Sequence, residues 1–111
     1  MENIEKLPVF GYKGNAYFFN VYPIQDKYPG GAGVYLIAKR VPAPNALYTV
    51  VFIGQTPTFD KISLPAQKEK LQSDGVNAVC ILPIESEEDR LKIVAELVER
   101  YKPICNADAN D

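Results

Sequence analysis

The side chains available for chemistry in this chain are tyrosines, lysines, arginines and carboxylates, because its 111 residues include no histidine and only two cysteines. Without histidine, neither a Ser-His-Asp nor a Cys-His arrangement can form, and no imidazole can act as a general base. Cys80 and Cys105 cannot supply the four ligands of a usual zinc site, and they form no CxxC motif. We interpret both as buried or half-buried thiols in a reducing compartment, with a single disulfide as the alternative.

The charge balance and the chain length bound the class of protein. The formal net charge is -2, from 12 Lys and Arg against 14 Asp and Glu. Domains that grip nucleic acid through its phosphates usually carry a basic excess, so this balance disfavours nonspecific nucleic-acid binding. The acidic start at residues 1–6 lacks the apolar core of a signal peptide, and the apolar runs are too short for a membrane span. We therefore expect one cytoplasmic domain over residues 1–111, with no membrane partner.

The hydrophobic pattern predicts four strands and two helices. Aromatic and β-branched residues predict strands over residues 16–24, 33–38, 47–54 and 77–84. One helix is expected from about residue 63 or 64 to 72, and another from the Ser86-Glu87-Glu88-Asp89 cap to the proline at 103. This order predicts an α+β fold, a small and mostly antiparallel sheet with helices packed on it.

Side-chain periodicity predicts which faces are buried. Alternation along strand 16–24 separates two sets, with Tyr17, Phe19 and Val21 on one face and Phe18, Asn20 and Tyr22 on the other. Strands 33–38 and 47–54 are almost continuously apolar, which predicts the buried middle of a sheet. In the last helix, the predicted buried stripe consists of Leu91, Val94, Leu97, Val98 and Tyr101.

Two tripeptides occur on neighbouring predicted strands, Gly33-Val34-Tyr35 and Phe52-Ile53-Gly54, and residues 101–106 follow a Tyr-x-Pro-x-x-Asn pattern. Together these motifs resemble the GIY-YIG endonuclease superfamily, and the resemblance covers residues 12–106. The stretch at residues 16–24 is similar to an additional N-terminal strand in one bacterial branch of that superfamily. The resemblance implies a GIY-YIG-like version of the predicted fold.

The resemblance also implies a catalytic site with a metal-binding carboxylate on a helix, a tyrosine near the attacking water, an arginine and often a histidine. The family-equivalent positions, in chain order, are Tyr35, Phe52, Ile62, Ala66, Val94 and Asn106. The first-motif tyrosine and the closing asparagine are retained, whereas Phe52 keeps the second ring without its hydroxyl. The arginine, histidine and metal-binding positions hold Ile62, Ala66 and Val94, so the resemblance implies no catalytic residue and no metal site.

A shift of one residue does not restore the metal ligand, because Ile93 and Ala95 flank Val94. Glu96 is the nearest carboxylate, but at about 100° per residue it is turned about 200° from Val94 and is expected to face solvent. A shift at the arginine position brings in Lys61, which supplies a point charge without a bidentate fork. Since phosphodiester hydrolysis depends on a held metal ion and fixed charge stabilisation, these replacements argue against catalysis.

The favoured function is therefore a catalytically inactive binding or interaction module. Its cleft would hold a protein partner or, weakly, a nucleic acid, and its expected binding residues are Tyr35, Phe52, Gln55, Lys61 and Asn106. One alternative is a divergent metal-dependent endonuclease, which alone implies a cofactor, Mg²⁺ or Mn²⁺, held by a relocated carboxylate such as Glu85 or Glu99. The other alternative is a structural or regulatory interaction protein unrelated to nucleic acid.

Two further groups of residues have simpler interpretations. Four tyrosines could form a surface on which bases stack, but we interpret them as ordinary sheet residues; they are Tyr17, Tyr22, Tyr35 and Tyr48. The acidic run Glu87-Glu88-Asp89 lies at the start of a predicted helix, where negative charge complements the helix dipole. It therefore does not predict a metal site.

Overall fold

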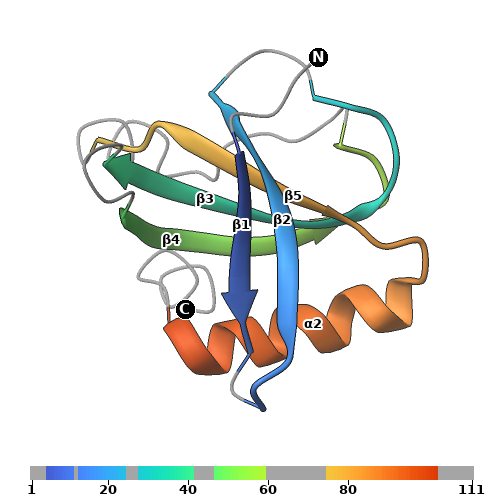
Figure 1. Ribbon diagram of the computed structural model, residues 1–111. Coiled ribbons are helices and arrows are strands. Elements are labelled where there is room, and N and C mark those ends of the chain that lie inside the picture. Colours follow the sequence, from blue (N-terminus) through green and yellow to red (C-terminus); the bar gives the residue numbers. More distant parts are fainter. Residues whose placement is uncertain (1–4, 12, 25–27, 42–46, 60–74, 103–111) are drawn as a thin grey trace, which may run out of the picture.

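The computed structural model describes residues 5–11, 13–24, 28–41, 47–59 and 75–102, which form five strands and one helix (Figure 1). The strands are β1 (Glu5–Phe10), β2 (Ala16–Pro23), β3 (Gly33–Val41), β4 (Leu47–Thr56) and β5 (Ala78–Pro83). The helix α2 (Glu87–Tyr101) follows β5. The predicted α+β class is confirmed, with an antiparallel sheet and one helix packed on it. The helix expected near residues 63–72 lies outside the described residues.

The strands pair in the order β1-β2-β5-β3-β4, and every pair is antiparallel. The last strand in sequence, β5, therefore lies between the β1–β2 pair and the β3–β4 pair. As predicted, β3 lies inside the sheet, but β4 lies at an edge of the described sheet, so its predicted central place is wrong. Its apolar run has another cause: Val50 packs against the core on one face, while Val51 and Phe52 pack on the other.

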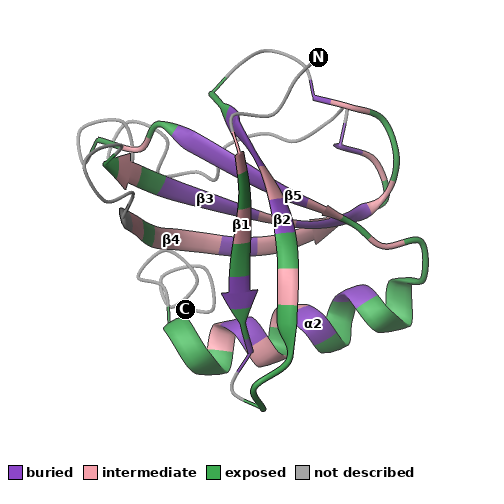
Figure 2. Ribbon diagram, in the orientation of Figure 1, coloured by how far each residue is buried: buried purple, intermediate pink, exposed green. Residues whose placement is uncertain are grey.

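Helix α2 covers one face of the sheet, and the largest hydrophobic cluster lies between them. Ile93 and Leu97 of α2 pack there with alternate residues of the strands; the buried strand residues are Val9, Phe19, Val21, Val34, Leu36, Ile53, Ala78 and Cys80. Figure 2 shows buried residues along β3, along β5 and on parts of α2. Removing these side chains from water supplies the main driving force for folding. The predicted alternation in β2 is confirmed, because Phe19 and Val21 face this cluster and Tyr22 does not.

The opposite face of the sheet is also covered by apolar side chains. Tyr22, Val79 and Ile81 of the sheet pack there with Tyr28 and Phe59 from the connecting segments. Gly33 allows this close packing, because a Cβ at residue 33 would overlap the backbone oxygen of Leu82 and the ring of Phe59. Both faces of the central strands are thus buried, which explains their nearly continuous apolar sequence.

The buried stripe of α2 differs from the predicted one. Leu91 is 51% exposed and Tyr101 is also exposed, whereas Arg90 and Ile93 are buried. The Arg90 guanidinium donates to the backbone carbonyls of Ile84 and Glu85 just before the helix, so Arg90 lies on the buried side, while the next residue, Leu91, points outward. Ser86 caps the helix as predicted by accepting a hydrogen bond from the Asp89 amide. Within the described residues, no helix has the length and apolar character needed to cross a membrane.

Strand β1 was not among the predicted strands. Pro8 interrupts its pattern, since proline has no amide hydrogen to donate to a strand ladder. The structure places β1 at the sheet edge, where a proline is tolerated. Leu7 and Val9 face the core under α2, while Lys6, Pro8 and Phe10 face outward.

Candidate functional site

The structure brings Tyr35 and Phe52 together, as the adjacent motifs suggest. Tyr35 on β3 pairs with Gly54 on β4, and the Tyr35 and Phe52 ring centroids are 5.9 Å apart. Gly54 makes room for both rings, because a Cβ at residue 54 would lie within 2.9 Å of each. Burial raises the pKa of the Tyr35 hydroxyl. Tyr35 therefore sits as a neutral, partly buried ring packed on other apolar side chains.

Val94 does not lie beside Tyr35. Val94 packs on the core beneath α2, on the face of the sheet that carries Val34 and Leu36. Successive side chains of a strand point to opposite faces, and Tyr35 accordingly packs on the other face, with Tyr22 and Phe52 among its neighbours. The sheet thus separates two positions that a GIY-YIG-type site would need in one cleft. Lys61, Ile62, Ala66 and Asn106 lie outside the described residues.

Gln55, an expected binding residue, is held by a buried arginine. Arg90 is 5% exposed, and its Nε donates to Gln55 Oε1 at 2.9 Å. Its Nη1 donates to the backbone oxygens of Ile84 and Glu85 at 3.2 and 2.7 Å. Arg90 therefore ties the start of α2 to the end of β4. The sequence carried one signal for this role, because Arg90 lies four residues before Val94 and seven before Leu97, at the helical spacing of the predicted apolar stripe.

Glu96 was expected to face solvent, but its carboxylate lies against another part of the protein. The Tyr17 hydroxyl on β2 donates to Glu96 Oε2 at 2.6 Å, so the carboxylate lies against the β1–β2 hairpin. Burial, followed by the contact with Glu96, raises the pKa of Tyr17. Glu96 Oε1 is buried and has no hydrogen-bond partner within the described part of the chain. Helical spacing gave the direction of Glu96 relative to Val94 but not the position of the hairpin that covers it.

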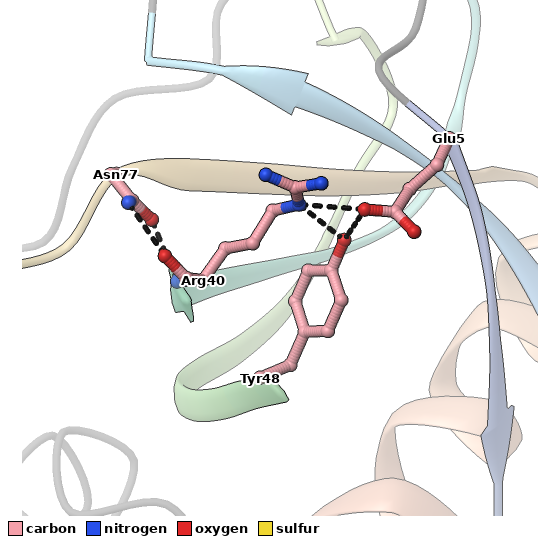
Figure 3. Close-up of polar contacts among 4 residues, drawn as sticks. All are labelled: Glu5, Arg40, Tyr48 and Asn77. Atoms are coloured by element: carbon pink, nitrogen blue, oxygen red, sulfur yellow. Dashed lines mark hydrogen bonds and ion pairs between the residues drawn. The ribbon is translucent and has the colours of Figure 1, made fainter. Parts of the chain in front are cut away.

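A second polar group joins the two edge strands of the sheet (Figure 3). The Arg40 Nε donates to Glu5 Oε1 at 2.6 Å and to the Tyr48 hydroxyl at 3.0 Å, and Tyr48 donates to the same Glu5 oxygen at 2.6 Å. Glu5 belongs to β1 and Tyr48 to β4, so the sheet curls until its edges meet through side chains. The Asn77 side chain pairs with the backbone of Arg40 and so extends the β3–β5 ladder.

These polar contacts set the charge states of their members. Hydrogen bonds from Tyr48 and then Arg40 lower the pKa of Glu5. Burial and the hydrogen bond to Glu5 raise the pKa of Tyr48 to about 12. Burial likewise raises the pKa of the Cys80 thiol to about 12, which makes it a poor nucleophile. The prediction of a buried thiol is confirmed for Cys80, whereas Cys105 lies outside the described residues. Near neutral pH, Tyr48 is therefore a hydrogen-bond donor and Cys80 an apolar core residue.

The described residues do not gather a metal-ligand set. No group of three or more His, Cys, Asp or Glu side chains lies close enough together in this part of the chain to hold an ion. Glu85 and Glu99, the relocated carboxylates of the endonuclease alternative, are both exposed. Glu99 lies on α2, on the side of the sheet away from Tyr35. Comparison with family models, curated proteins and solved structures finds no match for this chain.

Proposed function

We propose that this chain is a non-catalytic binding module, built on a GIY-YIG-like scaffold whose catalytic positions have become packing positions. The separation of Tyr35 from Val94 by the sheet carries this proposal. Both side chains are surrounded by apolar neighbours, one on each face. Because Tyr35 and Val94 pack on opposite faces of the sheet, the two side chains cannot contact the same substrate.

The energetics of phosphodiester hydrolysis support the same proposal. The reaction depends on positioning and on fixed charges near the transferred phosphate. Removing one preorganised charge-stabilising donor typically slows such a reaction by about 100- to 1,000-fold. At the family-equivalent positions, the metal ligand, the arginine, the histidine and one tyrosine hydroxyl are all replaced. Losses on this scale leave binding as the function that the scaffold can retain.

The outer face of the β1–β2 hairpin offers a surface for binding. Lys6, Pro8 and Phe10 point outward from β1, and Ala16, Phe18 and Asn20 point outward from β2. Phe10 is 46% exposed and Phe18 is 60% exposed. Phe10 pairs with Ala16 and Pro8 pairs with Phe18, so the two rings are diagonal neighbours on one surface. Adjacent exposed aromatic rings are typical of an interaction surface.

The chemistry of this face favours a protein partner over a nucleic acid. Lys6 is the one cation among its six outward residues, and it pairs in register with Asn20. A nucleic acid needs several cations to neutralise its phosphates, whereas aromatic anchors surrounded by small or uncharged residues suit a protein surface. The absence of an acidic residue from these six positions favours a partner with carboxylates beside its apolar contact residues.

A nicking assay tests the loss of catalysis. The purified full chain is incubated with supercoiled plasmid and Mg²⁺ or Mn²⁺, and the Tyr35→Phe variant is the matched control. We expect no scission above the level of the Tyr35→Phe variant. Metal-dependent nicking that Tyr35→Phe abolishes would overturn the proposal and favour the divergent endonuclease.

A second experiment tests the binding face. Partners retained by the wild-type chain are identified, purified and measured again with the double variant Phe10→Ser, Phe18→Ser. Because central aromatic anchors dominate interface energies, we expect affinity to fall at least about tenfold. Leu91→Ser is the control, since Leu91 is an exposed apolar residue on α2 rather than on the hairpin. Equal affinity for the wild type and the double variant would place the binding face elsewhere.

A further inference from the structure

One flank of α2 carries an apolar stripe that the sheet covers only in part. Its residues are Leu91, Val94, Val98 and Tyr101. Their intervals of three, four and three residues place them along one side of the helix. Val94 and Val98 are half-buried and pack against the core, whereas Leu91 and Tyr101 are exposed. The stripe therefore presents a large apolar side chain to water near each end of the helix.

This flank lies on the β4 side of the helix. The opposite flank carries Glu96, which contacts Tyr17 of β2. Val94 is turned about 200° from Glu96, and the strand order places β4 on the side of the sheet away from β2. Because β4 is the last strand of the described sheet in that direction, no described strand lies beyond the stripe. Another molecule can therefore approach the stripe from the side.

The two ends of the stripe carry opposite charges. Glu87 lies four residues before Leu91, and Lys102 lies four residues after Val98. Both charged side chains are exposed, and neither forms an ion pair with another described residue. The first turn of α2 is otherwise acidic as well, and its last turn is basic. An apolar stripe with an acid at one end and a base at the other is complementary to a reversed copy of itself.

We infer that this flank binds a second copy of the chain, with the two α2 helices antiparallel about a two-fold axis. The register that sets Leu91 against Val98 of the second copy also sets Glu87 against Lys102 of the second copy, because both pairs are centred on the same point of the helix. The two-fold symmetry repeats each pair, so the dimer contains two apolar contacts and two ion pairs of this kind.

The axis passes between Val94 and Ala95, the point on which both pairs are centred. Ala95 is exposed and small, so it lets the two helices approach closely there. An interface built on one helix of 15 residues is smaller than the standard interface of about 1,600 Å². We therefore expect a weak dimer, with a dissociation constant of about 10–100 µM.

The inference does not depend on the proposed function. Phe10 and Phe18 point to the face of the sheet away from α2, so the dimer leaves the outer face of each hairpin accessible. Leu91→Ser should therefore weaken self-association and leave partner binding at the hairpin unchanged. Failure of either proposal leaves the other in place.

Sedimentation equilibrium of the full chain tests self-association, at concentrations from about 5 µM to about 1 mM. We expect the dimer fraction to rise over this range, and Leu91→Ser to weaken the association at least about tenfold. The double variant Phe10→Ser, Phe18→Ser is the control and should associate like the wild type. A chain that stays monomeric throughout would overturn the inference, as would a dimer that Leu91→Ser leaves unchanged.

Charge reversal tests the antiparallel arrangement. Glu87→Lys and Lys102→Glu each place like charges opposite one another twice in the dimer, so each variant should associate at least about fivefold more weakly. The two changes combined restore opposite charges, and association should return to the wild-type level. Asp89→Lys is the control, because Asp89 lies in the same turn as Glu87 but is turned about 200° from it. Single variants as strong as the wild type, or a combined variant that does not recover, would contradict this arrangement.

Discussion

Arg90 is a buried cation that has carbonyl and amide oxygens as partners, and no carboxylate pairs with it among the residues described. Such a guanidinium remains charged inside a protein, so its donors need acceptors in fixed positions. Gln55, Ile84 and Glu85 provide those acceptors from two different segments. Arg90 therefore acts as a structural clamp, and its loss leaves three part-buried oxygens without this donor. Hydrophobic periodicity alone did not identify this role, because periodicity gives the face of a residue and not its partners.

Replacement of Arg90 by methionine tests the clamp. Methionine retains an apolar stem of similar length but cannot donate hydrogen bonds, so we expect the free energy of unfolding to fall by about 2–3 kcal/mol. Urea unfolding followed by circular dichroism provides the measurement. The control is Arg100→Met, because Arg100 is exposed in the last turn of the same helix and should change stability by less than about 0.5 kcal/mol. Equal effects of the two variants would show that Arg90 is not a clamp.

At the scale of the element, α2 illustrates how a correct helix can have a wrongly predicted face. Leu91 and Leu97 both fell on the predicted stripe, yet Leu91 is 51% exposed and Leu97 is fully buried. The sequence offers apolar residues at positions 91, 93, 94, 97, 98 and 101, which are too many for one stripe. In the structure, Arg90 lies on the buried side and contacts Gln55 of β4, and local periodicity does not encode this tertiary contact.

The two leucines allow a direct comparison within one helix. Leu97→Ala removes a side chain from the centre of the core, so we expect a loss of about 2–5 kcal/mol in the free energy of unfolding. Leu91→Ala removes a side chain that is half in water, so we expect a change of less than about 1 kcal/mol. Chemical denaturation of both variants distinguishes the observed face from the predicted one. A larger loss in Leu91→Ala would favour the predicted face.

Local sequence features explain which elements could be predicted. The strands β2, β3, β4 and β5 and the helix α2 were predictable because β-branched runs, the Ser86 cap and the spacing of apolar residues act locally. The edge strand β1 escaped prediction because Pro8 breaks its pattern and its partner strand decides its place. The contacts of Glu5 with Arg40 and Tyr48 join residues 35 and 43 positions apart, and no local pattern encodes such contacts. Arg90 and Glu96 likewise contact residues that are distant in the sequence, Gln55 and Tyr17. The motifs therefore located Tyr35 and Phe52 but not the roles of Arg90 and Glu96.

At the scale of the whole molecule, the Glu5–Arg40–Tyr48 group joins the two edge strands of the described sheet. Its strength depends on an ionised Glu5 and a protonated Tyr48. The lowered pKa of Glu5 means that its contribution is complete above the ordinary value of 4.5 and is lost as pH falls through the lowered value. The raised pKa of Tyr48 means that its contribution is complete below 10.0 and is lost as pH rises through about 12.

The variant Glu5→Gln should reveal this dependence on pH. We expect wild type to be more stable than Glu5→Gln between pH 4.5 and pH 10.0, and the difference to shrink as pH falls below 4.5. Thermal unfolding of both proteins across this range provides the measurement. Glu85→Gln serves as the control, because Glu85 is exposed and its replacement should leave the difference from wild type small throughout. If the stability difference between wild type and Glu5→Gln instead increased as the pH fell, Glu5 would not join the sheet edges as an anion.

The division of the molecule into two apolar faces also predicts that catalysis cannot be rebuilt by reversion. Val94→Glu places a carboxylate in the core under α2, on the face away from Tyr35, and should cost about 2 kcal/mol of stability. Combined with Ile62→Arg, it should still give no Mg²⁺-dependent plasmid nicking, because a metal ion held at residue 94 would be separated from Tyr35 by the sheet. Ala95→Glu, at the exposed neighbouring position, is the control for adding a carboxylate to α2. Nicking by the double variant that Tyr35→Phe abolishes would mean that both positions reach one cleft, contrary to the arrangement described here.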